Sequence, residues 1–258
     1  MELNLAGRTA LVTGASKGIG LGIAKRYAAE GCNLVMVARS RDQLEASADA
    51  IRKSAQINVR TLALDLSDQA QRDKLVETCP DIDVLINNAG AIPGGNIFDV
   101  DDKAWRDGWE LKVFGYVNLT RAYFTRMSER KRGVIINICG AGGERLSAGY
   151  IAGAAGNSSL MAFSRALGGT SVDYGVRVIA VNPGPVETDR IVYLAKQRAG
   201  SQLGDESRWR ESFASMPYGR PATTDEIAAM VVFLGSDLAS YISGTVITID
   251  AGSCNRNR

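Results

Sequence analysis

The chain has 258 residues, a net charge of only +2 and no histidine. This length fits one α/β domain, and the 45% of apolar residues suffice for a continuous core. The balanced charge and the lack of a basic run or nucleic-acid-binding signature argue against a nucleic-acid partner, and four scattered cysteines without a CxxC pair argue against a metal site.

Short apolar runs alternate with helical patterns along the whole chain. Strands are expected at 9–12, 33–38, 59–64, 84–86, 134–138, 176–181 and 245–249. Helices are expected at 21–30, 41–54, 67–79 (with Ser67 as N-cap), 101–127, 154–174 and 224–234. Unbroken Val, Ile and Leu runs indicate strands that are buried on both faces. The alternation predicts a Rossmann-type, doubly wound parallel α/β sheet, with residues 1–258 as a single domain.

The mostly polar segment 189–218 lies between the sixth strand and the last helix. It is interpreted as a mobile substrate lid over a binding site, and the alternative is a solvated insertion. The N-terminus carries no signal-peptide pattern, and no stretch approaches the ~20 apolar residues that span a bilayer. Unpaired cysteines suit a reducing compartment. We therefore expect a cytoplasmic protein that has no membrane anchor.

A glycine-rich segment, TGASKGIG at 13–20, follows the first predicted strand and opens the first helix. Gly14, Gly18 and Gly20 permit a tight turn and a close approach of the backbone to phosphate. The N-terminus of the following helix then favours the anion. Because the glycines stand in a strand–turn–helix context, they predict a dinucleotide site rather than a plain turn.

The spacing of these glycines resembles the short-chain dehydrogenase/reductase family, and the resemblance covers almost the whole chain. NNAG at 87–90, NPGPVET at 182–188 and the ending GTVITIDAG at 244–252 match motifs of that family, and Asp65-Leu66 matches the pair that it places against adenine. The resemblance implies a nicotinamide dinucleotide bound at Gly14, Ser16, Lys17, Gly18, Ile19, Gly20, Arg39, Asp65, Leu66, Asn88, Ala89, Gly90, Ile138, Asn157, Pro183, Gly184, Val186 and Thr188.

The second strand is followed by Arg39, where an NAD-selective site usually carries Asp or Glu. Arg39 and Lys17 would place two cations beside the 2′ position of the adenosine ribose. Such a pair fits a 2′-phosphate through charge-assisted hydrogen bonds. We therefore expect NADP(H) rather than NAD(H), and the alternative is that Arg39 is a solvated surface residue.

The positions that carry the chemistry in this family are occupied by other residues. Family members move a proton with a Tyr-x-x-x-Lys pair on one helix and orient the carbonyl with a preceding serine. The ungapped match of LMAFSRAL at 160–167 puts Gly153 at the tyrosine position and Asn157 at the lysine position, and the usual spacing puts Gly140 at the serine position. The resemblance therefore implies an atypical member of the family.

The nearest phenol is Tyr150, three residues before Gly153. On a continuous helix it would lie ~4.5 Å toward the N-terminus and ~60° around the axis, with its hydroxyl directed away from the family's position. A catalytic role for Tyr150 therefore competes with a role as a packing aromatic. If Tyr150 acts, its high pKa favours carbonyl reduction over alcohol oxidation.

Lys112 stands where the family usually has an asparagine, so that the amide and ammonium positions are exchanged with Asn157. We hypothesise that Lys112 brings its charge to the pocket and that Asn157 holds the hydroxyls of the nicotinamide ribose. The alternative is a loss of function in which Lys112 extends to solvent. Cys139, near the same pocket, is interpreted as a buried structural cysteine.

Three functions remain open on the sequence. The first is an atypical NADP(H)-dependent oxidoreductase that reduces a small carbonyl compound, because hydride transfer depends mainly on positioning. The second is a cofactor-binding protein without turnover, a sensor or a partner subunit. The third is a hydrolase or lyase that reuses the pocket. The resemblance also implies a homodimer or homotetramer formed through the two long helices and the C-terminal segment.

Overall fold

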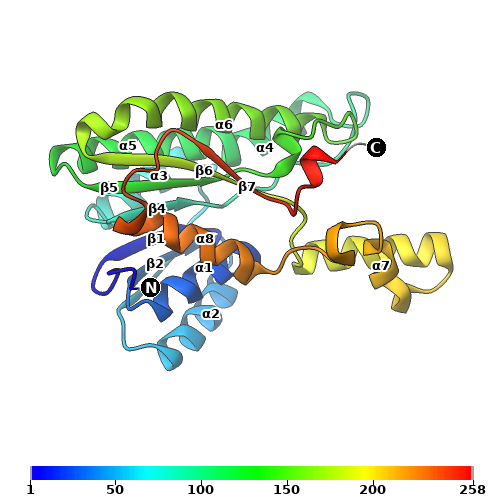
Figure 1. Cartoon of the computed structure of the whole chain (residues 1–258), viewed down its shortest axis with the longest axis horizontal. Helices are drawn as coiled ribbons and strands as arrows, with labels where there is room; N and C mark the ends of the chain where they lie inside the picture. Colours follow the sequence, from blue (N-terminus) through cyan, green and yellow to red (C-terminus); the bar gives the residue numbers. More distant parts are fainter. Residues whose placement is uncertain (1, 257–258) are drawn as a thin grey trace.

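A seven-stranded parallel sheet runs through the described part of the molecule in the order β3-β2-β1-β4-β5-β6-β7 (Figure 1). The computed structural model describes residues 2–256, apart from the side chain of Arg198. The strands are β1 (Thr9–Thr13), β2 (Asn33–Ala38), β3 (Val59–Ala63), β4 (Val84–Asn87), β5 (Gly133–Ile138), β6 (Val176–Pro183) and β7 (Val246–Ile249). The strand order reverses between β1 and β4, which is where ligands bind in such sheets. The predicted doubly wound α/β fold is confirmed.

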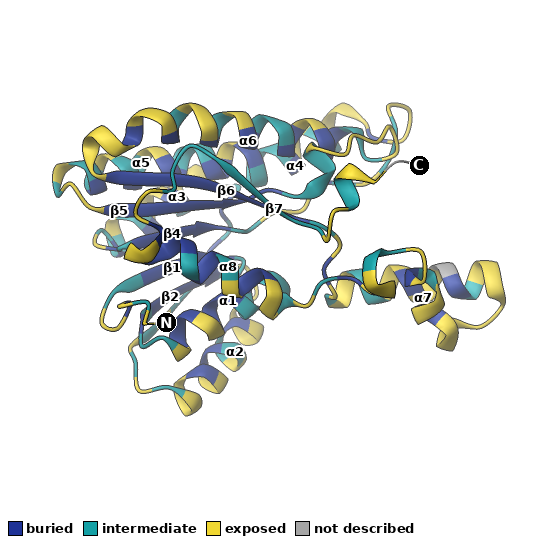
Figure 2. Cartoon of the chain, viewed as in Figure 1, coloured by how far each residue is buried: buried dark blue, intermediate teal, exposed yellow. Residues whose placement is uncertain are grey.

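Two helical layers cover the sheet, one on each face (Figure 1). The helices are α1 (Gly18–Ala29), α2 (Arg41–Ser54), α3 (Gln69–Thr78), α4 (Asp102–Trp109), α5 (Gly115–Glu129), α6 (Ile151–Thr170), α7 (Asp189–Leu203) and α8 (Thr224–Gly235). One layer consists of α1, α2 and α8, and the other of α3, α5 and α6. Figure 2 shows the buried strands between these layers.

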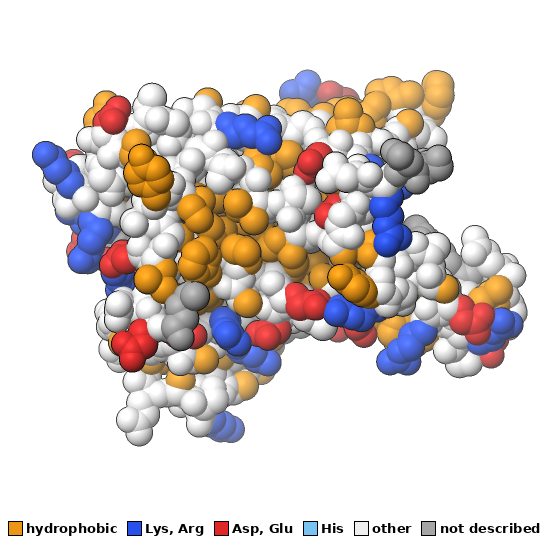
Figure 3. All heavy atoms as spheres, in the orientation of Figure 1, with side chains coloured by type: hydrophobic (Ala, Val, Ile, Leu, Met, Phe, Trp, Pro, Cys, Tyr) orange, Lys and Arg blue, Asp and Glu red, His pale blue; other side chains and the backbone are white. Residues whose placement is uncertain are grey.

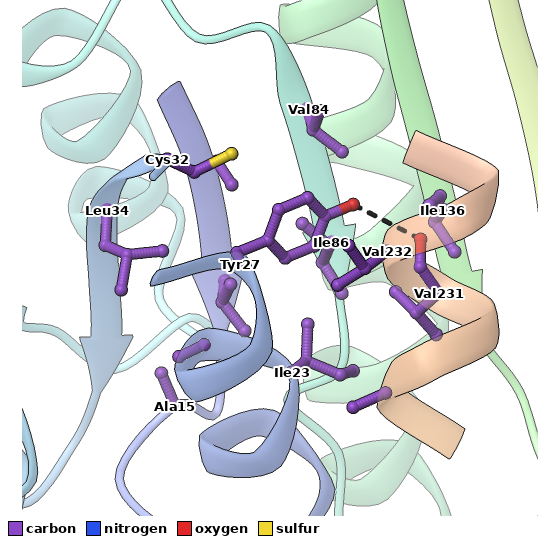
Figure 4. Packing of buried hydrophobic residues seen from close by; sticks show 14 of the residues in the cluster. Ala15, Ile23, Tyr27, Cys32, Leu34, Val84, Ile86, Ile136, Val231 and Val232 are labelled. Carbon is purple, nitrogen blue, oxygen red and sulfur yellow. Dashed lines mark hydrogen bonds between the residues drawn. The ribbon is translucent and has the colours of Figure 1, made fainter. Parts of the chain in front are cut away.

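The strands are buried on both faces because successive side chains point to opposite layers. In β1, Ala10 and Val12 pack beneath α1 and α8, whereas Leu11 packs on the opposite side. The fully buried Tyr27 of α1 fills the first layer, and its hydroxyl donates a 3.2 Å hydrogen bond to the carbonyl oxygen of Val231 in α8 (Figure 4). The core thereby fixes α1, and with it the loop that precedes this helix.

Several predicted elements have other bounds in the structure, among them α1, which begins at Gly18 rather than at residue 21. The helix expected at 101–127 is divided by one π-helical turn, η1 (Glu110–Phe114), between α4 and α5. The N-cap of α3 is Asp68 rather than Ser67, because the Ser67 hydroxyl donates to Asp65 at 2.7 Å. Helix α6 begins at Ile151, three residues before the expected start at 154.

The segment 189–218 contains regular structure of its own. It forms α7 and the 3₁₀ helix η4 (Glu206–Phe213), which pack on each other around Ala195, Ala199 and Trp209. Figure 1 shows this pair standing away from the sheet, on the side of the C-terminal ends of the strands. Across residues 2–256, the helices lack the combined length and apolar character that crossing a bilayer requires.

Candidate functional site

The loop between β1 and α1 provides a cradle for phosphate. Gly14 and Gly18 have φ values of 67° and 56°, which favour glycine. A Cβ on Gly20 would overlap the carbonyl oxygen of Gly14, so only glycine lets the helix start this close to the turn. The N-terminus of α1 has no side-chain cap and no acidic residue in its first turn. Its free N–H groups therefore suit an anion.

Thr13, at the end of β1, connects this loop to the turn after β4 through hydrogen bonds. Its hydroxyl oxygen accepts hydrogen bonds from the backbone N–H groups of Asn88 (2.8 Å) and Ala89 (3.0 Å), and donates to Ile86 (3.2 Å). The Asn88 side chain donates to the carbonyl oxygen of Thr13 at 2.9 Å. The two loops on either side of the switch point are thus one rigid unit.

Lys17, Arg39 and Asp65 lie at the strand ends beside the cradle, where the adenosine is expected. Lys17 and Arg39 are exposed, and neither forms an ion pair within residues 2–256. Burial opposes ionisation of Asp65, but hydrogen bonds from Ser67 and the charge of Arg39 outweigh it and lower the pKa of this carboxyl group. Leu66 is buried in the core below, and Ser16 is largely buried within the loop.

The loop after β6 closes the other side of the cradle. The methyl carbon of Thr188 lies 3.3 Å from the position that a Cβ on Gly18 would take. The backbone N–H of Gly184 donates to Ile249 at 2.9 Å, and Val186 bridges to Ala222. Thr188 is also the N-cap of α7, so the lid segment starts directly at the dinucleotide loop.

A cleft of about 940 Å³ opens between these loops and the segment 189–218. It is lined by Ile19 of the cradle, by Lys112, Tyr150 and Asn157, and by Pro183 to Val186 and Thr188 of the β6 loop. Figure 3 shows the segment 189–218 protruding from the body of the molecule, with basic side chains where the two meet. The sequence-predicted residues of the catalytic region therefore converge on one space.

Gly140 lies two residues after the end of β5. Its backbone has φ 155° and ψ 138°, a conformation that favours glycine. A Cβ at this position would lie only 3.2 Å from the amide nitrogen Nδ2 of Asn157. The following turn packs directly on α6, where the hydroxyl of Ser158 donates to Gly143 at 2.6 Å. The Asn157 amide thus fills the space that a side chain at position 140 would need.

Tyr150 lies elsewhere than a continuous helix would place it. It is the N-cap of α6, with φ −140° and ψ 39°, so the helical extrapolation fails at this residue. Its ring folds over Gly153, where a Cβ would overlap the ring carbon Cζ. The ring also lies 3.1 Å from the position of a Cβ on Gly142. Tyr150 therefore takes the volume of a side chain at position 153, although it starts three residues earlier.

The electrostatic surroundings of Tyr150 differ from those that we expected. Burial raises the pKa of its phenol, while the charge of Arg190 and a hydrogen bond from the Asn157 amide oppose this shift. Arg190, in the first turn of α7, is therefore the cation that acts on Tyr150. The carbonyl-side oxygen of Asn157, Oδ1, is buried and has no hydrogen-bond partner in the structure.

Lys112 is directed into the cleft rather than to solvent. Its Nζ donates a 2.7 Å hydrogen bond to the carbonyl oxygen of Cys139, at the end of β5. The stem of Lys112 crosses Gly90, where a Cβ would lie 2.7 Å from the lysine Cδ. Burial lowers the pKa of this ammonium group. Ile138, the last residue of β5, accepts a 3.2 Å hydrogen bond from the Tyr116 hydroxyl and is fixed in the same way.

Arg190 and Arg256 line the cleft and were not singled out from the sequence, because an exposed arginine carries no motif that identifies its surroundings. Arg145, in the loop after β5, lines the cleft as well. Cys139 is buried, and burial raises the pKa of its thiol to about 12, as suits a structural residue. Within residues 2–256, no group of three or more His, Cys, Asp or Glu side chains could hold a metal ion.

The cradle at the switch point, its uncapped helix and the adjoining cleft define a Rossmann-type dinucleotide-binding protein. Comparison with known proteins agrees. The family model described as "short chain dehydrogenase" matches residues 8–199 of this chain. The 3-oxoacyl-[acyl-carrier-protein] reductase FabG of Escherichia coli is 33% identical over 255 residues, which cover 97% of this chain and 98% of that protein. The oxidoreductase UcpA of Salmonella typhimurium is 33% identical over 256 residues, with coverages of 96% and 95%.

Solved structures extend this similarity to three dimensions. L-sorbose reductase from Gluconobacter frateurii, in complex with NADPH and L-sorbose, has a TM-score of 0.94 and 30% identity over 100% of both chains. Levodione reductase has a TM-score of 0.89 and 29% identity over 98% of this chain and 100% of that chain. The protein belongs to the short-chain dehydrogenase family and is an NAD(P)-dependent oxidoreductase.

Proposed function

We propose that this protein uses NADP(H) to reduce a small carbonyl compound, with Tyr150 as the proton donor. The observation that carries the proposal is the position of the Tyr150 ring, which occupies the space above Gly153 at the cleft. In this view the enzyme is an atypical family member, because Gly140, Gly153 and Asn157 replace the residues that usually do the chemistry.

The residues of the chain have distinct roles in this proposal. When bound, the reduced nicotinamide supplies a hydride to the carbonyl carbon. The phenol of Tyr150 donates a proton to the developing alkoxide, and its raised pKa keeps it protonated at neutral pH. Asn157 has an unpaired buried oxygen that can accept a hydrogen bond from a ribose hydroxyl. Lys112 keeps the end of β5 in place through Cys139 and contributes positive charge.

The preference for NADP(H) is supported by Lys17 and Arg39, which are exposed beside the cradle and form no ion pair within the described residues. A 2′-phosphate would supply the missing partner through charge-assisted hydrogen bonds. The complex of L-sorbose reductase with NADPH is consistent with this choice.

The cofactor preference is tested by titrating the protein with NADPH and NADH. We expect tighter binding of NADPH, and Arg39→Asp should weaken NADPH binding by about tenfold or more because a charge-assisted contact is lost. Lys53→Asp, which makes the same charge change in the last turn of α2, is the control and should leave the affinity intact. Equal or tighter binding of NADH by the wild type would contradict the preference.

Turnover is tested with a panel of aldehydes and ketones by following NADPH oxidation. Reduction that is sensitive to Tyr150→Phe supports the proposal. Stoichiometric NADPH binding without any oxidation would instead indicate a cofactor-binding protein. Product formation that needs no cofactor would indicate a hydrolase or lyase.

A further inference from the structure

The cleft is positively charged although the chain is nearly neutral. The whole sequence has 30 basic and 28 acidic residues. Among the described residues that line the cleft, Lys112, Arg145, Arg190 and Arg256 are basic, and none is Asp or Glu. Such a cleft with charges of one sign concentrates ligands of the opposite charge.

The dinucleotide accounts for only part of this charge. Arg190 also lines a second cavity together with Arg39 and Ser67, along the expected adenosine side. Arg145 and Arg256 do not line that cavity, and they belong to the loop after β5 and to the C-terminal segment. Two guanidinium groups of the cleft, those of Arg145 and Arg256, therefore lie outside the cavity on the expected adenosine side.

Two acidic residues, Glu144 and Asp250, also act on this region, where burial, together with their charges, raises the pKa of the Cys254 thiol in the cleft. Neither Arg145 nor Arg256 forms an ion pair within residues 2–256. The carboxylate of Glu144 accepts hydrogen bonds from Asn182 (2.9 Å) and Thr248 (2.7 Å) instead. Asp250 accepts from the backbone N–H groups of Gly252 (2.8 Å) and Cys254 (2.6 Å). Both carboxylates keep their charge, but they bind these neutral donors and form no ion pair with Arg145 or Arg256 within residues 2–256.

We propose that the substrate is an anionic carbonyl compound, and that Arg145 and Arg256 bind its oxyanion while its carbonyl group lies at Tyr150. This inference rests on the proposed reductase function and specifies its substrate class. The carbonyl carbon gains the hydride from NADPH and the oxygen gains the proton of Tyr150, so that an oxo acid becomes a hydroxy acid and NADPH becomes NADP⁺. The planar fork of a guanidinium group matches carboxylate and phosphate alike.

The test compares charged substrates with neutral partners of similar shape. Oxo acids of increasing length are each paired with their methyl ester, and dihydroxyacetone phosphate is paired with dihydroxyacetone. We expect kcat/KM of the wild type to be at least about tenfold higher for the anion in the preferred pair. The oxo acid and phosphate arms identify which oxyanion is used.

Variants locate the binding group. In Arg145→Met and Arg256→Met the ratio of kcat/KM between the anion and its neutral partner should fall toward one. Arg165→Met, an exposed position on α6, removes the same charge and should keep the wild-type ratio. Equal kcat/KM for both members of every pair in the wild type, or an unchanged ratio in the Arg145/Arg256 double variant, would overturn the inference.

Ligand binding tests the inference even if the protein turns over no carbonyl compound. Binding of succinate, with succinamide as the neutral control, is measured by calorimetry on the NADPH-saturated protein. Binding of succinate that is lost in Arg145→Met supports the oxyanion site even if no carbonyl compound is reduced. Reduction of neutral ketones without any preference for anions, and without succinate binding, would overturn this inference and leave the reductase function standing.

Discussion

Tyr150 and Gly153 are complementary residues at the start of α6. The ring of Tyr150 lies where a Cβ at position 153 would be, so the tyrosine can bend over the helix only because residue 153 has no side chain. The ring carbons Cζ, Cε1 and Cε2 all lie within 2.3 Å of that Cβ position, so any side chain at 153 would displace the phenol. We infer that Gly153 serves the position of the phenol rather than the flexibility of the helix.

Gly153→Ala should therefore lower kcat for carbonyl reduction by about 10² or more, because the added methyl group displaces the proton donor. The measurement is steady-state NADPH oxidation, together with the dissociation constant of NADPH, which should stay unchanged.

Gly169→Ala on the same helix is the matched control, since no atom lies within 4 Å of its added Cβ. Activity should be retained there, and stability should rise by up to ~1 kcal/mol from the better helix propensity of alanine. Full activity of Gly153→Ala would contradict a role for the Tyr150 position.

The pH dependence should report the raised pKa of Tyr150. A proton donor acts in its protonated form, which persists up to the pKa, and burial moves that value above its usual level near 10. The reduction rate should be constant from pH 7 to about 10 and decline only above it, whereas alcohol oxidation should rise with pH throughout that range.

Tyr150→Phe should abolish both dependences and lower the reduction rate by ~10²–10⁴. Tyr241→Phe, at a fully exposed position, is the control. A reduction rate in the wild type that falls with a midpoint near pH 7 would exclude Tyr150 as the donor.

Sequence spacing predicted the glycine-rich turn between β1 and α1 because its glycines follow directly from backbone requirements. Gly14, Gly18 and Gly20 are fixed by positive φ or by close contacts, and such constraints leave a motif. The position of the Tyr150 ring could not be predicted, because it depends on the backbone dihedral angles of Tyr150 itself, the N-cap of α6. Arg190 was missed because an exposed arginine has the same sequence signal whether it faces a cleft or bulk water.

The segment 189–218, interpreted from the sequence as a lid, has its own small core, separate from those of the sheet. Trp209 of η4 packs edge-on against Phe213, with ring centroids 5.6 Å apart, and it contacts Ala195 and Ala199 of α7. Arg210 lies over the Trp209 ring at 4.3 Å from its centroid. Because this core is small and lies apart from the sheet, the segment can loosen without unfolding the domain.

Trp209→Ala should raise KM severalfold and accelerate proteolysis within 189–218, because losing a buried tryptophan costs about 3–5 kcal/mol and the lid has few other contacts. The affinity for NADPH should remain. Arg210→Ala keeps the ring and removes a contact worth ~0.5–1 kcal/mol, so its effect should be small. An unchanged KM in Trp209→Ala would contradict the lid interpretation.

Element types were predicted better than the interruptions between them. β2 and α2 have the expected bounds because apolar periodicity and turn residues coincide there. The π-helical turn at Glu110–Phe114 inserts one residue and leaves the helical pattern of the sequence unchanged. The sequence therefore predicted one long helix across it. Helices α7 and η4 pack mainly on each other and lie in a mostly polar stretch of sequence, so composition alone did not indicate regular structure there.

At the scale of the whole molecule, the outer surface of α4 and η1 carries exposed apolar groups. Phe114 is 48% exposed and lines a cavity with Trp105 and Trp109. We predict that this surface is part of a contact between copies of the chain, as expected from the family resemblance. Light scattering should give two or four times the 27.5 kDa of one chain.

Phe114→Glu should shift that mass toward the monomer, because a buried charge without a partner is costly in an interface. Leu203→Glu, at an exposed site of the lid, should leave the mass unchanged. A monomeric wild type would refute the prediction. The sheet itself was predictable from buried strand runs, whereas an association between copies of the chain would depend on surface residues that follow no period.

Tyr150 and a side chain at position 153 compete for one volume. Whether a mutation at one of these positions is harmful or beneficial therefore depends on the residue at the other. Introducing tyrosine at 153 alone would force two rings together, and losing Tyr150 alone would remove the phenol. An active site with tyrosine at 153 is thus separated from the present one by at least two harmful single steps. Descendants of this chain should therefore keep glycine at 153 for as long as they keep tyrosine at 150, because the steric conflict makes each single change harmful.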